Sequence, residues 1–355
     1  MRRKTRSVQV GRVTIGGHHP IAIQSMTNTP TSDRAATLAQ INRLSAAGCE
    51  IVRVAVPDAE ALLGFAYLVD STSVPLVADI HFDYRLAIGA IERGAAEVRI
   101  NPGNIGGLTE VRSVLAAAAR HNTAVRIGVN SGSLPQAVLA RFGGVTPEAM
   151  VESALLYERE VLGFGFENLI FSLKSSDVYT TIRANVLFSE RSDFPLHVGV
   201  TEAGTLQTGA VRSAVGISVL LSMGIGDTIR VSLTADPVEE VYVAKEILAS
   251  LNLGPKPLRI VSCPTCARTS GDLIAIADMV ERNLQEYAQL PLKVAIMGCS
   301  VNGPGEARDA HVGIALAPGG AVLFRAGQSV ELVPLSEAAK RLTAEVKLLA
   351  ETLAK

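Results

Sequence analysis

Residues 75–101 read PLVADIHFDYRLAIGAIERGAAEVRIN, and this stretch contains one complete unit of the predicted fold. It starts with an apolar run over 75–80, which is followed by a helical pattern over 84–93 and a second apolar run over 97–101. Asp83 stands where the N-cap of the helix is expected. A strand, a helix and another strand in such close succession are typical of a parallel βαβ unit.

The same alternation continues through most of the chain. Apolar runs rich in β-branched residues predict eight strands, at 21–25, 51–56, 75–80, 97–101, 124–129, 168–174, 195–200 and 228–233. Stretches between them predict helices, among them 32–47, 84–93, 108–120, 147–162 and 237–251. Eight consecutive βα units favour a closed (β/α)8 TIM barrel over a doubly wound sheet, which has no preference for eight strands. Residues 7–17 are predicted to form a hairpin that closes the bottom of the barrel.

A linker is predicted at Gly254-Pro255-Lys256-Pro257, since two prolines around a lysine can continue neither a helix nor a central strand. The predicted domains are therefore a barrel over 1–253 and a small α+β domain over 258–355. Within the second domain we expect strands at 258–262, 293–297 and 311–316, helices at 272–287 and 336–354, and a hairpin across Gly319 and Gly320.

The composition is that of a soluble, well-packed α/β enzyme, with 48% hydrophobic and 19% charged residues in a chain of 355. A net charge of -1 gives no global basic field for nucleic acid, so an anion site must be a local cluster. The basic start lacks an apolar segment behind it, and we expect neither a signal peptide nor a membrane span. Four cysteines, three of them clustered, favour metal or redox use in a reducing cytoplasm over disulfides.

Polar side chains recur at every second position near the ends of the predicted strands. Residues with this spacing point into a barrel, and the catalytic groups of TIM barrels gather at that face. We call this face of the barrel, at the ends of the strands, its mouth. The candidate residues of the mouth are Gln24, Met26, Asn28, Arg53, Asp79, His81, Arg99, Asn101, Arg126, Gly128, Asn130, Ser172, Lys174, Arg230 and Ser232.

Positive charge dominates the predicted mouth, where Asp79, Glu97 and Glu202 do not neutralise every cation. Buried cations without partners cost several kcal/mol each, and a dense anion such as a diphosphate would balance them through bidentate arginine contacts. Ordinary salt bridges with acids of the barrel loops are the alternative. The cations concerned are Arg53, Arg99, Arg126 and Lys174.

The six histidines show no HxxxH or HExxH spacing, which gives a zinc site in the barrel little support. His81 follows a predicted strand and stays a candidate for the site. No role is assigned to His18, His19 or Cys49.

Three cysteines in the second domain point to a metal or redox site: Cys263 and Cys266 form a CxxC motif, and Cys299 ends a separate predicted strand. Structural zinc would need a fourth ligand, for which His311 is available. A thioredoxin-like site would use the CxxC motif alone at a helix start. A [4Fe-4S] cluster would use all three thiols, with Glu306 on the Gly303-Pro304-Gly305 turn as the fourth donor.

Taken together, these motifs resemble the 4-hydroxy-3-methylbut-2-en-1-yl diphosphate synthase family, iron-sulfur enzymes of the non-mevalonate pathway of isoprene biosynthesis. The resemblance covers nearly the whole chain, in the compact bacterial form without a large insertion. Ala267 and the run Ala310-His311-Val312 depart from the usual family pattern, and none of these is a cluster ligand. The motifs on which the resemblance rests are residues 24–29, 52–57, 79–84, 99–104, 126–132, 201–204, 226–232, 263–266 and 301–306.

The resemblance implies a two-electron reductive ring opening of 2-C-methyl-D-erythritol 2,4-cyclodiphosphate, with loss of water. It implies a [4Fe-4S] cluster as cofactor, with an exchangeable iron, on Cys263, Cys266, Cys299 and Glu306. Catalytic roles fall to Glu202, Glu306 and His81, and Glu202 is the candidate for delivering a proton to the departing hydroxyl. The residues implied to hold the diphosphate are Arg53, Arg99, Asn101, Arg126, Asn130, Lys174 and Ser232.

The family also implies partners: flavodoxin or ferredoxin as electron donor, and a homodimer in which the cluster domain of one subunit caps the barrel of the other. We expect a cytoplasmic enzyme that binds neither nucleic acid nor membrane. Two other functions stay open on the residues alone: a phosphate-binding barrel transferase or lyase with a structural zinc domain, and a non-catalytic iron-sulfur sensor.

Overall fold

The computed structural model describes residues 2–254, 258–287, 290–299 and 308–353. The chain divides into two compact units, Met1–Gly254 and Pro255–Lys355. Each unit has its own hydrophobic core. Residues 255–257 of the predicted linker lie outside the described residues.

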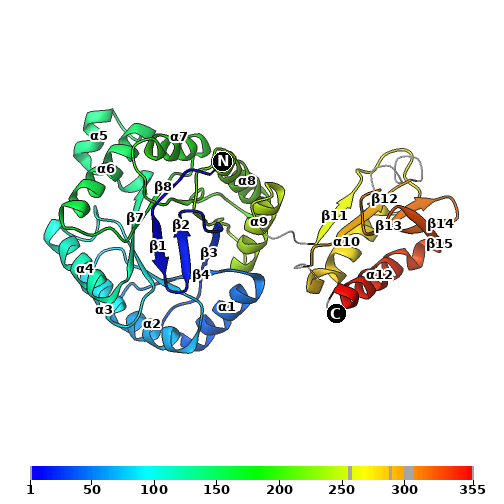
Figure 1. Ribbon diagram of the computed structural model, residues 1–355, viewed down its shortest axis with the longest axis horizontal. Helices are drawn as coiled ribbons and strands as arrows, with labels where there is room; N and C mark the ends of the chain where they lie inside the picture. The colour runs from blue at the N-terminus through cyan, green and yellow to red at the C-terminus, as the bar shows by residue number, and fades with distance from the viewer. Residues whose placement is uncertain (1, 255–257, 288–289, 300–307, 354–355) are drawn as a thin grey trace. The chain divides into compact units, whose positions relative to one another are not determined.

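Parallel strands form the ring at the centre of the first unit (Figure 1). They are β3 Ala22–Met26, β4 Ile51–Ala55, β5 Leu76–Asp79, β6 Glu97–Ile100, β7 Ala124–Asn130, β8 Leu169–Lys174, β9 His197–Val198 and β10 Thr228–Ile229. Their order is β8-β7-β6-β5-β4-β3-β10-β9, and a bridge between Phe171 and Leu196 joins the two ends. The prediction of a TIM barrel is confirmed.

Strands β9 and β10 are shorter than predicted, with two residues each. Side chains take over backbone hydrogen bonds that a longer strand would make. The Leu196 N–H donates to Asp227 Oδ2 at 2.9 Å, and the Leu233 N–H donates to Glu240 Oε1 at 3.1 Å. The backbone at this part of the barrel is therefore tied to carboxylates as well as to neighbouring strands.

A ring of helices surrounds the strands (Figure 1). The helices are α1 Arg34–Ala47, α2 Ala59–Ser71, α3 Tyr84–Glu92, α4 Leu108–His121, α5 Gln136–Phe142, α6 Pro147–Gly163, α7 Val178–Ser189, α8 Leu206–Ser222 and α9 Pro237–Ser250. Asp33 and Asp83 cap α1 and α3 through their carboxylates, and the cap at Asp83 confirms the one predicted from the sequence. Gly48 ends α1 in the left-handed conformation, with φ 100°.

A hairpin of β1 Ser7–Val10 and β2 Val13–Gly16 forms the floor of the barrel, which confirms the predicted plug. Its turn is at Gly11 and Arg12, while Gly16 is the last residue of the second strand and Gly17 follows it. Val8, Val10 and Ile15 pack in one apolar cluster with the first inward-facing residues of five barrel strands: Ala22, Ile51, Val77, Ala124 and Ile170.

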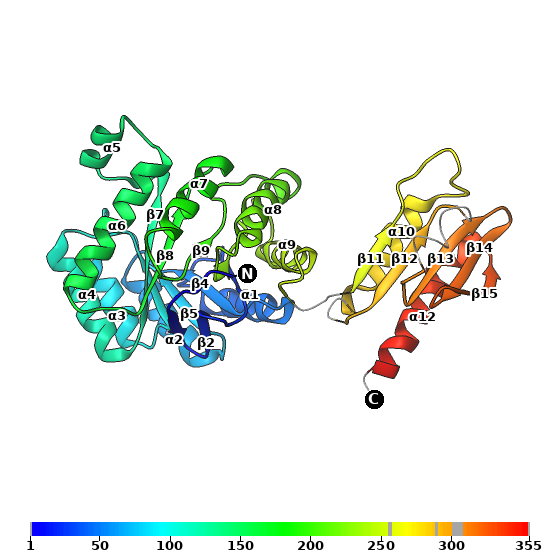
Figure 2. The ribbon, with the colours of Figure 1, turned by 45° about the horizontal axis from the view of Figure 1, so that its top comes forward.

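In its described residues, the second unit is a five-stranded mixed sheet with helices α10 and α12 (Figure 2). The strands, in spatial order, are β11 Arg259–Ser262, β12 Lys293–Met297, β13 Val312–Ala317, β14 Gly320–Arg325 and β15 Gln328–Val333. The first three are parallel and the others antiparallel. The helices are α10 Leu273–Asn283 and α12 Ala338–Leu353. Short 3-10 turns are η2 Gln285–Tyr287 and η3 Leu335–Glu337 in this unit and η1 Ser131–Ser133 in the barrel. In the described part of the chain, no helix is both long and apolar enough to span a membrane.

Candidate active site

A charged layer lies above the apolar floor of the barrel. The strand register sets Asp79 on β5 beside Arg99 on β6, and Arg99 beside Arg126 on β7. All three side chains are at most 6% exposed. Parallel strands in register therefore bring charges from separate parts of the sequence to one level of the barrel.

Asp79 is the anionic centre of this layer. Its carboxylate lies 3.5 Å from Arg99 Nη1, 3.9 Å from Arg53 Nε and 3.9 Å from His81 Nδ1. Burial by itself would raise the pKa of Asp79, but the positive charges of Arg53 and Arg99 outweigh burial and lower it. Burial lowers the pKa of Arg53 to about 9, despite the nearby carboxylate.

Gly128 on β7 gives Arg99 its position. A Cβ atom at Gly128 would lie 2.5 Å from Arg99 Nε, a distance that real Cβ contacts do not reach. The Arg99 guanidinium therefore occupies the space that any side chain at position 128 would take. The glycine in the Arg126-x-Gly128 pattern is explained by this close approach.

Arg126 lies deeper in the barrel than the sequence suggests. Its side chain is fully buried, with its Nε 3.2 Å from the equally buried Glu97 carboxylate. Arg126 Nη1 also donates to Gln24 Oε1 at 2.8 Å. Burial lowers the pKa of Arg126 and raises that of Glu97. Desolvation therefore disfavours the charged form of both residues of this pair.

A cavity of about 280 Å³ opens at the C-terminal ends of these strands. Five of the predicted site residues line it together: His81, Arg99, Asn101, Asn130 and Glu202. Asn104, Ser131, Gly132, Ser133 and Thr201 complete the wall and were not predicted as site residues, although each lies in or beside a quoted motif. Of the residues implied to hold the diphosphate, four are not part of this lining: Arg53, Arg126, Lys174 and Ser232.

Glu202 sits on the loop between β9 and α8 with φ 53°, in the left-handed region. A non-glycine residue there carries backbone strain of about 1–3 kcal/mol. Its side chain is exposed at the cavity, so solvent and a bound ligand can both reach the carboxylate. A strained, exposed acid beside buried cations is typical of a catalytic group.

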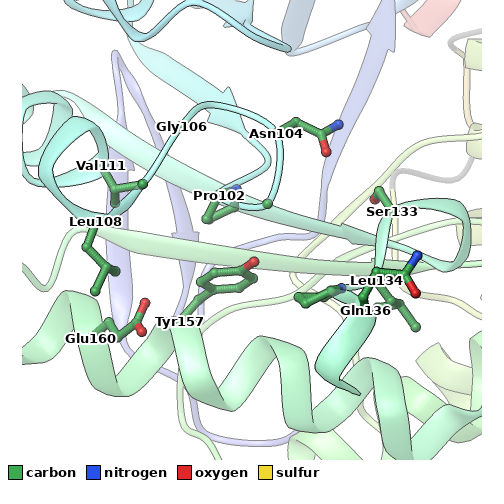
Figure 3. A pocket seen from close by; sticks show the side chains of 13 residues that line it. Pro102, Asn104, Gly106, Leu108, Val111, Ser133, Leu134, Gln136, Tyr157 and Glu160 are labelled. Atoms are coloured by element: carbon green, nitrogen blue, oxygen red, sulfur yellow. The ribbon is translucent and has the colours of Figure 1, made fainter. Parts of the chain in front are cut away.

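A second, larger cavity of about 480 Å³ adjoins the first and shares Asn104 and Ser133 with it. Tyr157 and Glu160 of α6 face it from one side, and the loops that precede α4 and α5 face it from the other (Figure 3). Its lining contains no lysine, arginine or histidine and one carboxylate, Glu160. A diphosphate needs cations, so chemistry favours the smaller cavity as the anion site.

The second unit brings two of its cysteine positions to one edge of the sheet. Cys263 directly follows β11, and Cys299 lies just beyond β12, which runs parallel to β11. Cys263 Sγ accepts a hydrogen bond from the Gly298 N–H at 3.1 Å, the kind of contact that stabilises a thiolate ligand. Cys266 is exposed, on a turn in which its N–H donates to Thr269 Oγ1 at 3.1 Å.

The position of His311 disfavours a zinc site that combines it with the three thiols. The His311 N–H bonds to Lys293 O at the start of β12, and His311 Nδ1 accepts from the Lys293 N–H. Cys299 lies beyond the other end of that strand, which alone spans about 13 Å at 3.3 Å per residue. The thioredoxin-like alternative also lacks its helix, because α10 starts at Leu273, well after Cys266.

Glu306, the predicted fourth donor, lies outside the described residues. Among the residues that are described, no group of three or more His, Cys, Asp or Glu side chains is placed to hold a metal ion. Cys49 stands apart as a buried thiol, and burial raises its pKa to about 12, which agrees with the absence of a predicted role.

Comparison with known proteins identifies the family. A sequence model of the GcpE TIM-barrel domain matches residues 5–245, and one of the GcpE protein C-terminal domain matches residues 259–348. The chain belongs to the GcpE family. The two GcpE domains together span nearly all of the chain, in agreement with the resemblance seen in its motifs.

Relatives of this GcpE chain have one name in common, 4-hydroxy-3-methylbut-2-en-1-yl diphosphate synthase (flavodoxin). The protein of Caldanaerobacter subterraneus subsp. tengcongensis is 50% identical and covers 98% of each chain. That of Geobacter sulfurreducens is 51% identical over 99% of each chain, and that of Maridesulfovibrio salexigens is 55% identical over 94% of this chain and 92% of its own.

A solved structure at low identity resembles this chain in its fold. The N-acetylneuraminic acid synthetase of Leptospira borgpetersenii serovar Hardjo-bovis superposes with TM-score 0.50 at 12% identity, covering 81% of this chain and 99% of that chain. At this identity the likeness concerns the fold alone.

Lys174 is a buried cation of the GcpE barrel with other cations around it. It is 7% exposed, and the charges that act on it most are those of Arg53, Arg126, Arg230 and Arg99. Burial first, and these cations second, lower its pKa well below the ordinary lysine value. An anion in the mouth would relieve this repulsion.

Lys174→Met should therefore flatten the alkaline pH dependence of stability. Between the lowered folded pKa of Lys174 and the ordinary value of about 10.4, the unfolded chain binds more protons, so the free energy of unfolding rises with pH. In the variant, the slope of the free energy of unfolding against pH should fall by up to the contribution of one bound proton. Denaturant unfolding at several alkaline pH values measures this slope. Lys4→Met, which changes an exposed lysine of the same unit, is the control. Equal slopes for wild type and Lys174→Met would contradict the assignment.

Proposed function

We propose that this chain is an enzyme that converts 2-C-methyl-D-erythritol 2,4-cyclodiphosphate into 4-hydroxy-3-methylbut-2-enyl diphosphate. Two electrons and two protons enter, one carbon–oxygen bond to the diphosphate breaks, and the hydroxyl of the neighbouring carbon leaves as water. The observation that carries the proposal is the identity of about half to relatives of this name over nearly the full length. The cation-rich barrel supports it on physical grounds.

The barrel, residues 1–253, is the proposed diphosphate-binding domain. Arg99, Asn101 and Asn130 line the smaller cavity and supply direct donors for phosphate oxygens. Arg53, Arg126, Lys174 and Ser232 would act from the surrounding wall and from below. The largely buried cations Arg53, Arg99, Arg126, Lys174 and Arg230 outnumber the buried carboxylates beside them, Asp79, Glu97 and Glu240, so positive charge is in excess where an anion would bind.

Glu202 is the proposed proton donor. The departing hydroxyl must be protonated to leave as water, and a carboxyl group at the cavity wall is suited to this role. His81 shares that wall and lies 3.9 Å from Asp79, so it can orient the substrate or hold a proton at its Nδ1.

The second unit, residues 258–355, is the proposed cluster-binding domain. Cys263, Cys266, Cys299 and Glu306 would hold a [4Fe-4S] cluster, and the thiol donors with the N–H···S bond to Cys263 fit such a group. When bound, the cluster supplies electrons one at a time and an iron that acts as a Lewis acid. As a ligand Glu306 is a hard carboxylate, which fits an iron position that exchanges its ligand.

Flavodoxin is the proposed electron donor, in line with the name of the relatives, and ferredoxin is the alternative. We further propose a cytoplasmic homodimer in which the cluster domain of one subunit meets the barrel mouth of the other. The dimer gives the cluster access to the substrate.

Anaerobic purification followed by metal analysis and an activity assay tests the proposal. We expect iron and sulfide at about four each per chain, and turnover of the cyclic diphosphate with reduced flavodoxin. About one zinc per chain without iron would favour the transferase or lyase with a structural zinc domain. Iron in the protein without turnover of the cyclic diphosphate would favour the alternative of a non-catalytic iron-sulfur sensor.

Cys266→Ser should lose most of its iron and its turnover, because a serine oxygen replaces a soft thiolate ligand. Iron content and the visible absorption spectrum of the anaerobically purified protein measure this. Cys49→Ala is the matched control: it removes a thiol that is buried in the barrel core and should keep the iron. Iron loss in both variants would mean that folding, and not ligation, was disturbed.

A further inference from the structure

Half of the buried polar side-chain atoms that lack a hydrogen-bond partner within the described residues belong to one layer of the barrel. They belong to residues on β3, β6, β7, β9 and β10, between the apolar floor and the mouth. The atoms are Gln24 Nε2, Glu97 Oε1 and Oε2, Arg126 Nε and Nη2, His197 Nδ1 and Nε2, and Thr228 Oγ1.

Two of these atoms, Arg126 Nε and Glu97 Oε1, attract each other as an ion pair at 3.2 Å. The others are not tolerated in a stable domain unless water satisfies them. Each buried polar atom without a partner bears its full desolvation cost, and native interiors place ordered water at such groups. The layer is lined by polar atoms on several sides, which gives a water molecule the two to four partners that it needs. We therefore regard these residues as a hydrated layer beneath the anion site.

His197 differs from the other members because both of its ring nitrogens lack partners while its side chain is 1% exposed. Burial, followed by Lys174, Arg126, Arg53 and Arg230, lowers its pKa well below the ordinary value. The ring is thus neutral, with one N–H donor and one acceptor nitrogen. Gln24 Oε1 already accepts from Arg126, and the Glu97 carboxylate forms an ion pair with the same guanidinium. The bare nitrogen of His197 is an acceptor in this layer outside those two interactions.

Lys174 lies close to this part of β9. Its Nζ is 3.1 Å from the position that a Cβ atom at Gly199 would occupy, and Gly199 faces the same side of the chain as His197, two residues earlier. Of the charges acting on His197, that of Lys174 is the strongest. The Lys174 side chain therefore ends beside the segment of chain that carries His197.

We propose that His197 is a positioning residue for anion binding: through buried water it accepts hydrogen bonds from Lys174 and Arg126 and holds their donors toward the mouth. This inference rests on the proposed diphosphate site. It adds a residue below that site which meets no substrate atom.

A pair of substitutions separates positioning from packing. His197→Leu keeps most of the volume and removes both nitrogens, whereas His197→Gln keeps a donor and an acceptor. We expect His197→Leu to weaken the binding of inorganic diphosphate, measured by calorimetry, by about tenfold, and to raise KM for the cyclic diphosphate similarly while kcat changes less than about twofold. His197→Gln should restore most of the affinity. His18→Leu, at an exposed position, should change neither.

The outcomes are distinguishable. If wild type binds diphosphate but fails to turn over the cyclic substrate, the proposed function is wrong while the role of His197 is still tested by binding. Equal diphosphate affinity in wild type and His197→Leu overturns the inference, and so does a loss that His197→Gln fails to rescue.

Should His197→Leu fold poorly, NMR of the unsubstituted protein with 15N-labelled histidine decides. The ring signal that disappears in His197→Gln should stay neutral from about pH 5.5 to 8 and should shift when diphosphate saturates the site. A ring that titrates in this range, or that ignores diphosphate, overturns the inference.

Discussion

Glu202→Gln is expected to lower kcat by about 10²- to 10⁴-fold, the contribution typical of a positioned general acid. The amide has the same shape and can donate a hydrogen bond, but it cannot release a proton to the departing hydroxyl. Binding should change little, because Arg99, Asn101 and Asn130 remain in the cavity wall. Steady-state kinetics with the cyclic diphosphate, together with iron content and circular dichroism, would establish whether only kcat falls.

Glu160→Gln is the matched control for this experiment. It makes the same chemical change at the neighbouring cavity, which has no cations in its lining. Activity should stay near that of wild type. If Glu202→Gln keeps full activity, Glu202 has no part in proton delivery, and if both variants are equally slow, the effect is one of general charge and not of position.

The backbone at Glu202 offers a second observable. A glycine relieves the cost of φ 53°, so Glu202→Gly should not lower the free energy of unfolding even though it removes a side chain at the catalytic site. Retained stability with lost activity would indicate that strain at this loop serves function.

The barrel was predictable because its signals are local. Each strand is an apolar run, each helix has its own periodicity, and caps such as Asp33 and Asp83 act within a few residues. Strand β15 was not predicted, since it is an edge strand whose residues are exposed except Val333. The shortness of β9 and β10 depends on Asp227 and Glu240, whose hydrogen bonds join distant parts of the chain.

The candidate site was predictable to the extent that strand parity sets direction. Parity correctly indicates that Asp79, Arg99 and Arg126 face inward. It does not indicate how deep in the barrel each side chain lies. The floor hairpin raises the apolar base of the barrel, and Arg126 pairs with Glu97 inside instead of lining the cavity. The roles of Gly128 and His197 depend on what lies across the barrel from them, and a single sequence does not contain that information.

Glu97→Gln should lower the free energy of unfolding of the barrel by about 3–5 kcal/mol, a fall in Tm on the order of 10 °C. The substitution keeps the shape of the side chain but leaves the Arg126 charge fully buried without its carboxylate, and several other cations are nearby. Denaturant unfolding followed by circular dichroism measures this loss. Arg43→Gln removes an exposed ion pair with Asp236 and should cost about 0–1 kcal/mol by comparison.

The double variant Glu97→Leu with Arg126→Met tests whether the unpaired charge causes the loss. An apolar pair of similar volume removes both desolvation costs, so stability should return to near that of wild type or exceed it. Diphosphate affinity should stay low in the double variant, because a cation below the mouth is gone. Recovery of stability without recovery of binding would mean that this buried pair is retained for the anion site and not for the fold. If the double variant is as unstable as Glu97→Gln, packing around the pair, and not its charge, limits the stability of the barrel.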